Sequence, residues 1–188
     1  MYRLIYTIKI KEQILLQEIL INDSIVIIFF NNKKSIYIKK NNGLYLVDSE
    51  NQMLSLINTS SFQKHNEILS KKIGFISNEK ESRQEYIYGY LSQLYNCRNN
   101  DSSFNCKIKT ICVPDFEFTS YNSYYNFAIG NQLVGIPLSK NEVLAYNKTE
   151  INLNEIKQIV ETELTIIEKI KIQNDLLKIV DYKMTSNE

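Results

Sequence analysis

Apolar and polar residues alternate with a period of two at the start of the chain, and this pattern constrains its fold more than any other feature. In YRLIYTIKI, residues 2–10, every second residue is apolar: Leu4, Tyr6, Ile8 and Ile10. Residues two apart in an extended strand point to the same side, so these four share one face. The sequence therefore predicts that the chain begins in a β-sheet with one buried face.

Further β-rich runs follow up to residue 48, separated by turns of Asn, Lys and Gly. The run IVIIFF, residues 25–30, contains no polar residue, which predicts a strand covered on both faces. Asn42 and Gly43 both tolerate a positive φ, so the pair predicts a tight hairpin turn. The segment EQILLQEIL, residues 12–20, fits a helical turn and a strand equally well.

The middle of the chain has the features of helices. SENQMLSLINT (49–59) and SSFQKHNEILSKK (60–72) each open with a serine that can cap a helix. In NEKESRQEYIYGYLSQLYN (78–96), Asn78 and Glu81 resemble a capping box. Apolar residues of this segment recur at helical spacing: Ile87, Leu91 and Leu94. We therefore expect three helices, of which 78–96 is the clearest.

The later part of the chain returns to β-type patterns. Residues 97–106, CRNNDSSFNC, have the composition of a loop, whereas KIKTICV (107–113) and EVLAY (142–146) read as strands. Residues 153–183 fit either one long helix or a helix, a strand and a closing helix. The β-branched run at 165–167 favours the second arrangement.

Together these patterns predict a single α+β domain over residues 1–188. Its parts are an antiparallel N-terminal sheet, central helices, a second β region and a C-terminal helix. The loop at 97–106 is the one candidate boundary for a subdivision. A chain of 188 residues can bury roughly 70% of its unfolded surface in one domain.

Charge and composition exclude several classes of protein. The 22 Lys and Arg nearly balance the 21 Asp and Glu, so the chain lacks the basic excess of a nucleic-acid binder. Its longest apolar run is far shorter than the ~20 residues that span a bilayer, and its start does not resemble a signal peptide. We therefore expect a soluble cytoplasmic protein with no membrane partner, of undefined oligomeric state. The frequent Ile, Asn, Lys and Tyr are typical of an AT-rich genome, so Asn- and Lys-rich stretches are assigned to composition.

The sequence offers no residues for a catalytic, metal or cofactor site. The single histidine, His65, lies among polar and charged residues, where we expect it to be exposed on a helix. Asp115 and Glu117 share a face of an extended segment and are best explained as solvated. The spacing of the three cysteines matches no close zinc-binding pair: they are Cys97, Cys106 and Cys112. Cys112 falls in an alternating strand, so we expect it to be buried.

A cluster of tyrosines supplies the candidate binding residues. Tyr121, Tyr124 and Tyr125 lie within TSYNSYYNF, residues 119–127. Tyrosine is enriched at interface hot spots, so an exposed cluster would form a recognition patch for another protein. The alternative is that part of the cluster is core.

Beside this cluster, SYYNFAIGNQLVGIP (123–137) resembles a segment of agmatine deiminases and bacterial-type peptidyl-arginine deiminases. The residues in register with that family are Ser123, Tyr124, Asn126, Phe127, Ile129, Asn131, Val134 and Pro137. The resemblance implies a deiminase-like (pentein) relative. The family's cysteine nucleophile beyond this stretch has no counterpart, because no cysteine follows Cys112, and its His-x-Asp pair is also missing. A β-hairpin turning at Gly130 and Asn131 explains the same residues without kinship.

The sequence thus predicts a non-enzymatic cytosolic binding protein, such as a partner, inhibitor or immunity-type module that contacts another protein. The alternative is a deiminase-like enzyme fragment or a catalytically inactive relative.

Overall fold

The computed structural model describes residues 1–40, 43–57, 76–81, 85–99, 103–116, 141–153, 156–171 and 178–184, and of residues 76–81 only the backbone. Within these residues the chain forms one sheet of thirteen strands, β1 to β13, and a short 3-10 helix, η1. The first six strands are β1 (Tyr2–Ile10), β2 (Gln13–Ile21), β3 (Ile25–Phe30), β4 (Lys33–Lys40), β5 (Gly43–Asp48) and β6 (Met53–Leu56). The remaining elements are β7 (Ile76–Glu81), β8 (Tyr86–Ile87), β9 (Tyr90–Asn99), β10 (Phe104–Cys112), β11 (Glu142–Leu153), β12 (Ile156–Lys169), η1 (Lys178–Asp181) and β13 (Lys183–Met184).

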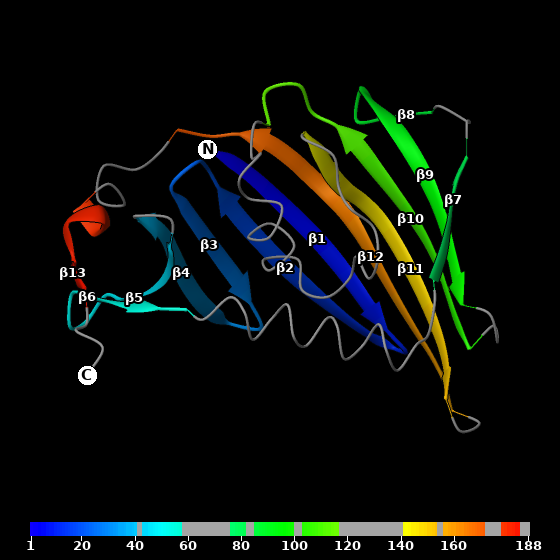
Figure 1. The fold of residues 1–188 in the computed structure, drawn as a ribbon, viewed down its shortest axis with the longest axis horizontal. Helices are drawn as coiled ribbons and strands as arrows, with labels where there is room; N and C mark the ends of the chain where they lie inside the picture. The colour runs from blue at the N-terminus through cyan, green and yellow to red at the C-terminus, as the bar shows by residue number, and fades with distance from the viewer. Residues whose placement is uncertain are drawn as a thin grey trace.

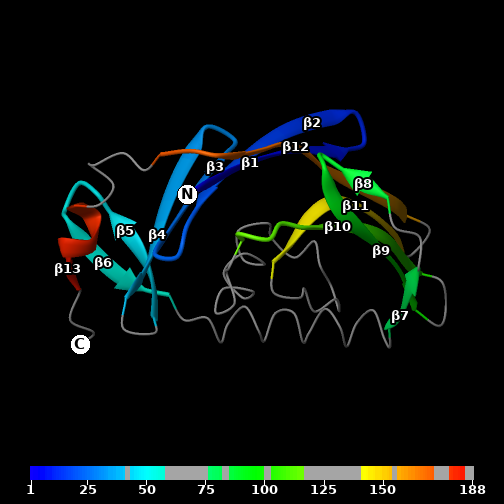
Figure 2. The ribbon, with the colours of Figure 1, turned by 90° about the horizontal axis from the view of Figure 1, so that it is seen from above.

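The strand order joins the two ends of the sequence in the middle of the sheet. The order is β13-β6-β5-β4-β3-β2-β1-β12-β11-β10-β9-β7, with β8 paired to β9 off this path. Every pairing is antiparallel except β13 with β6. Figure 1 shows β12 lying beside β1, and Figure 2 shows that the sheet is strongly curved. Antiparallel meanders of this kind need only short connections, which the Asn- and Gly-containing turns provide.

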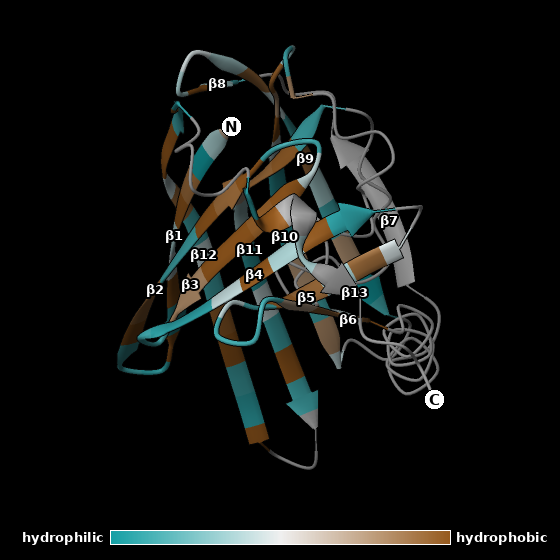
Figure 3. Ribbon diagram, turned by 90° about the vertical axis from the view of Figure 1, so that its left-hand side faces the viewer, coloured by the Kyte–Doolittle hydropathy of each residue, from teal (hydrophilic) through white to brown (hydrophobic). Residues whose placement is uncertain are grey.

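The main core lies on the face of the sheet that carries Leu4 and Tyr6, which we call the core face. The expected alternation along β1 is confirmed, because Leu4, Tyr6 and Ile8 are buried while the residues between them are more exposed. Figure 3 shows the same alternation of apolar and polar residues along the longer strands. Cross-strand partners share a face, so β9 to β12 add to this core. Its largest fully buried members include Tyr6, Phe104, Phe116, Leu4 and Ile108.

A second core lies on the opposite face, over β3 to β6. Ile27 pairs with Leu20, which pairs with Arg3, so Ile27 lies on the face opposite Leu4. It packs there in a cluster whose buried members are Ile25, Ile27, Ile36, Ile38, Val47, Leu54 and Ile179. Val26 belongs instead to the main core. Ile25, Val26 and Ile27 are 1%, 3% and 1% exposed, so the strand predicted to be covered on both faces is confirmed.

The predicted α+β class is wrong, because the described residues contain strands and one 3-10 turn but no α-helix. The helix expected at 78–96 is replaced by β7, β8 and β9. Tyr88 and Gly89 have φ values of 52° and 77°, which end any helix and form the tight turn between β8 and β9. Within the segment 49–59, also expected to be helical, Met53–Leu56 form β6, where Leu54 pairs with Val47 and is fully buried. The helix expected at 60–72 lies outside the described residues.

The C-terminal helices are also corrected. Residues 153–183 are neither one long helix nor a helix, a strand and a helix: β11 ends at Leu153 and β12 covers Ile156–Lys169. The strand expected around Thr165 is confirmed as part of β12. Of the predicted closing helix, the described residues form η1 and the start of β13. The pairing of β12 with β1 and β11 makes this segment a strand. The local spacing of its apolar residues contains no information about that pairing.

Three smaller expectations are settled. Residues 12–20, which fitted a helix or a strand, lie almost entirely in β2. A hairpin does join β4 to β5, and Gly43 is the first residue of β5, paired with Lys40. The predicted loop at 97–106 is shorter than expected, because β9 extends to Asn99 and β10 begins at Phe104.

In the described part of the chain, no helix is long and apolar enough to cross a membrane.

Candidate functional site: a groove on the charged face

The face opposite Leu4 carries rows of charged residues on β1, β12, β11, β10 and β9, and we call it the charged face. The register sets one row across five neighbouring strands: Lys9, Glu161, Lys148, Lys107 and Asn96. The next row contains Thr7, Glu163, Tyr146, Lys109 and Leu94. Each residue in a row lies directly opposite the next, at a distance where side chains interact.

Two adjoining hollows form a groove across these rows. The first has a volume of about 340 Å³ and is lined by Asn96, Cys97, Arg98, Asn105, Cys106, Lys107, Lys148 and Glu150. The second has a volume of about 430 Å³ and is lined by Ile87, Tyr88, Lys107, Lys109, Ala145, Tyr146, Glu163 and Leu164. Lys107 lines both, so the hollows meet at its side chain. We call the two together the groove.

The β8–β9 hairpin forms one wall of the groove. Its turn residue Tyr88 donates a hydrogen bond from its hydroxyl to the carbonyl oxygen of Leu164 on β12, at 2.6 Å. Just before β8, Glu85 forms an ion pair with Lys109 on β10, and its carbonyl oxygen accepts a hydrogen bond from the Ser92 amide. These contacts hold the hairpin against β10, with which β9 pairs, and against β12, with which it does not pair, so the groove has a defined edge.

Ion pairs organise most of the lysines in and beside the groove. The Lys148 ammonium lies 3.4 Å from a carboxylate oxygen of Glu161 and 3.6 Å from one of Glu150. The hydrogen bond to Glu161 raises the pKa of Lys148, and the hydrogen bond from Lys157 lowers the pKa of Glu150. Both groups are therefore charged at neutral pH.

Lys107 differs from these lysines. It is exposed and lies directly opposite Lys148, and no residue in the described ranges forms an ion pair with it. Like charges directly opposite one another destabilise a sheet. The middle of the groove therefore has a positive charge that the described side chains leave unbalanced.

Two phenols complete the polar lining. Burial raises the pKa of Tyr88, and nearby Glu163 raises it further. Burial also raises the pKa of Tyr146, with Glu161 as the next cause. Both phenols therefore stay protonated at neutral pH and can donate hydrogen bonds.

The described residues bear on two of the sites weighed from the sequence, a metal site and a pair of carboxylates. No group of three His, Cys, Asp or Glu among them is placed to hold a metal ion. Asp115, one of the two weighed carboxylates, is exposed and forms an ion pair of 2.7 Å with Lys169.

Several predicted site residues lie outside the described residues: His65, Glu117, Tyr121, Tyr124, Tyr125 and the whole stretch 123–137. Their roles stay predictions. Cys112 is exposed, so the expectation that it is buried is wrong. The ladder explains this: Cys112 pairs with Glu142 beyond a bulge at Lys109 and Thr110, and the bulge shifts the alternation of the strand.

Sequence reasoning missed the groove residues Arg98, Lys107 and Lys148. The available signal was the alternation in NCKIKTI, which places Lys107 and Lys109 on one face with Cys106 and Ile108 on the other. This alternation was not used, because Lys-rich stretches were assigned to the composition of the genome.

Comparison with known proteins adds little. No family model matches the chain, and no curated protein matches it. Two solved structures of PNGF-II are similar: in the C2 crystal form the TM-score is 0.49 with 15% identity, over all of this chain and 31% of that chain. In the P21 form the TM-score is 0.45 with 16% identity, over 98% of this chain and 31% of that chain. The chain spans about a third of the length of these structures, and neither likeness assigns a function.

Proposed function

We propose that this chain is a non-enzymatic interaction protein that binds an acidic segment of a partner protein in the groove. The observation that carries the proposal is the unbalanced Lys107 directly opposite Lys148, at the point where the two hollows meet. A partner carboxylate between these ammonium groups would offset their repulsion. The class of function is the one that the sequence predicts, with a different set of residues.

The rest of the lining suits an acidic polypeptide. Arg98 lines the first hollow and Lys109, which is paired with Glu85, lines the second. Glu150 and Glu163 limit the positions at which acidic side chains of a partner fit. Exposed ion pairs such as Lys148 with Glu161 are worth little in stability, so a partner's carboxylates can replace them at small cost. Tyr88 and Tyr146 supply amphipathic surface of the kind found at protein interfaces.

The test compares two variants in which a lysine is replaced by glutamate, one in the groove and one elsewhere on the sheet. Lys107→Glu is compared with Lys33→Glu, because Lys33 is also exposed but lies at the start of β4, beside the β3–β4 turn. The probe is a fluorescein-labelled oligoglutamate peptide, and binding is followed by fluorescence anisotropy. We expect Lys107→Glu to weaken binding about tenfold, which corresponds to about 1.4 kcal/mol, and Lys33→Glu to leave it unchanged.

The salt dependence of the same titration is a second readout. Binding carried by exposed charges weakens as ionic strength rises, since the screening length falls to ~3 Å at 1 M salt. The proposal is wrong if the unmodified chain does not bind oligoglutamate at low salt. It is equally wrong if both variants lose affinity to the same extent.

A further inference from the structure

Two buried cysteines face each other beneath the groove. Cys97 on β9 and Cys106 on β10 are directly opposite in the ladder, and they are 2% and 6% exposed. Both belong to the main core, beside Phe104 and Ile108. The two thiols also interact: the Cys106 side chain lowers the pKa of Cys97, and the Cys97 side chain raises the pKa of Cys106.

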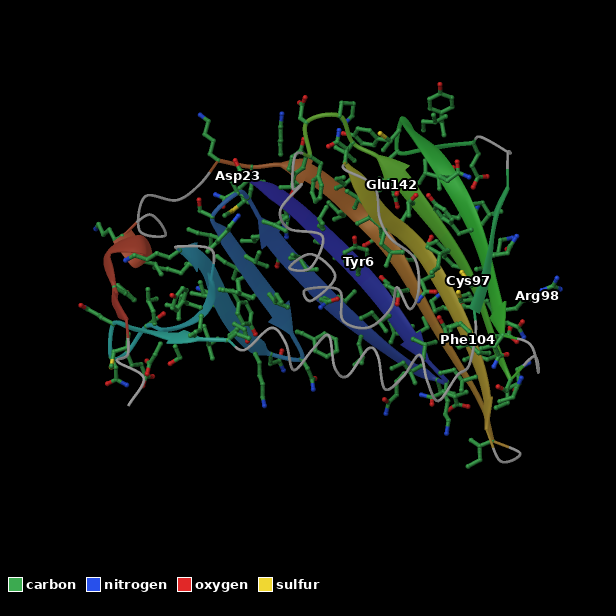
Figure 4. The ribbon with its side chains drawn as sticks, viewed as in Figure 1. Tyr6, Asp23, Cys97, Arg98, Phe104 and Glu142 are labelled. Atoms are coloured by element: carbon green, nitrogen blue, oxygen red, sulfur yellow. The ribbon has the colours of Figure 1, made fainter. Side chains whose placement is uncertain are left out.

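The sequence neighbours of both cysteines line the groove. The residues on either side of Cys97 are Asn96 and Arg98, and those on either side of Cys106 are Asn105 and Lys107. All four line the first hollow of the groove. Figure 4 shows Arg98 extending away from the sheet next to Cys97. The cysteine pair therefore lies on the two strands that carry six of the eight residues lining that hollow.

The geometry of an antiparallel pair suits a disulfide. Directly opposite residues have Cα atoms about 4.5 to 5.5 Å apart, inside the range of about 4.4 to 6.8 Å that disulfides require. Nearby, Asn99 donates to the Ser103 hydroxyl and accepts from the Phe104 amide, which holds the end of β9 beside the start of β10. The two strands are thus held in register at the cysteines before any bond forms.

We propose that Cys97 and Cys106 are a reversible dithiol–disulfide pair that a peroxide oxidises, and that the bond fixes the floor of the groove. The sulfur of Cys97 attacks one oxygen of hydrogen peroxide; the O–O bond breaks, water leaves, and Cys97 becomes a sulfenic acid. The sulfur of Cys106 then displaces the hydroxyl group, which forms the S–S bond and releases a second water. Two thiols lose two electrons and two protons, and the peroxide is reduced to two waters.

The order of these steps follows from the interaction between the thiols. The Cys106 side chain lowers the pKa of Cys97, whereas the Cys97 side chain and burial raise the pKa of Cys106. Cys97 therefore provides the more reactive sulfur, and Cys106 is the resolving thiol. A small oxidant is required because both sulfurs are buried, which excludes a bulky disulfide such as oxidised glutathione.

The chemical test needs no binding partner. The Cys112→Ser variant removes the exposed thiol and leaves only the pair. After hydrogen peroxide, we expect its intact mass to fall by two hydrogen atoms, no thiol to be titratable after unfolding, and dithiothreitol to restore both thiols. Adding Cys97→Ser to this variant should give oxygen adducts on Cys106 or no reaction. The inference is overturned if both thiols remain free, or if both gain oxygen without joining.

The effect on the groove rests on the proposed function and is read separately. A cross-link between β9 and β10 reduces their relative motion, so the oxidised chain should bind the oligoglutamate probe severalfold more tightly than the reduced chain. Disulfide formation with unchanged binding would overturn the coupling but not the dithiol chemistry. If the reduced chain does not bind oligoglutamate at all, the proposed function fails while the mass test still stands.

Discussion

The Tyr88 hydroxyl donates a 2.6 Å hydrogen bond to the Leu164 carbonyl oxygen and ties the β8–β9 hairpin to β12, a strand with which it shares no ladder. Figure 1 shows β8 at the end of β9, away from the sheet path. This bond closes one wall of the groove, so Tyr88 links the fold to the proposed binding site.

The first prediction concerns this contact. Tyr88→Phe should weaken oligoglutamate binding severalfold, because the hairpin loses the bond that positions it, and stability should fall by only about 1 kcal/mol. The matched control is Tyr86→Phe, since Tyr86 lies in the same hairpin and is 75% exposed. Anisotropy titrations and urea melts of the two variants check this. Equal losses of affinity in both would show that Tyr88 does not position the wall.

A second prediction concerns the core face. The buried Tyr6 hydroxyl donates a 3.0 Å hydrogen bond to the Leu144 carbonyl oxygen, reaching from β1 past β12 to β11. Tyr6→Phe should lower the free energy of unfolding by about 1 kcal/mol, whereas Tyr6→Ala should lower it by about 3 to 5 kcal/mol through the cavity it leaves. Urea denaturation measures both. A neutral Tyr6→Phe would show that this bond adds nothing to the joining of the two halves of the sheet.

A third prediction concerns alkaline pH. Burial, followed by the charge of Glu142, raises the pKa of Tyr95 from 10.0 to about 12. Since the folded state binds this proton more tightly than the unfolded state, the stabilisation is fully present below pH 10 and is lost as the pH rises towards 12. Stability should therefore fall across this window.

Replacing Tyr95 shows how much this residue contributes to the loss of stability above pH 10. Tyr95→Phe should be less stable at neutral pH, because the 3.0 Å hydrogen bond to Glu142 is lost, but its stability should fall less steeply above pH 10. Tyr86→Phe serves again as the exposed control. Denaturant midpoints measured from pH 8 to 12 decide the matter, and parallel curves for Tyr95→Phe and the unmodified chain would contradict the prediction.

The N-terminal sheet could be predicted because its pattern is local. Leu4, Tyr6 and Ile8 alternate and are buried, and the unbroken apolar run of β3 is covered by two cores. The helix predicted for residues 78–96 is wrong, because Ile87, Leu91 and Leu94 have helical spacing although the segment forms strands. Only the pairing of β9 with β10 and the positive φ of Tyr88 and Gly89 decide that this segment is a hairpin.

The groove could not be predicted for a related reason. Lys107 and Lys148 are 41 positions apart, and only the register of β10 on β11 places them opposite each other. The local pattern of NCKIKTI gives the face of β10 on which Lys107 lies, but it does not show which residue lies opposite. The pairing of Cys97 with Cys106 depends in the same way on the β9–β10 hairpin, within a segment that composition identifies only as a loop.

NMR shifts of the backbone amides during a titration map, residue by residue, where oligoglutamate binds, and so test the groove directly. We predict that the shifts cluster on β9, β10 and β11 around Arg98, Lys107 and Lys148, with few on β4 to β6. Lys107→Glu should reduce them and Lys33→Glu should not. Shifts centred on β4 to β6, or no saturable shifts at low salt, would contradict the claim that the groove binds an acidic partner.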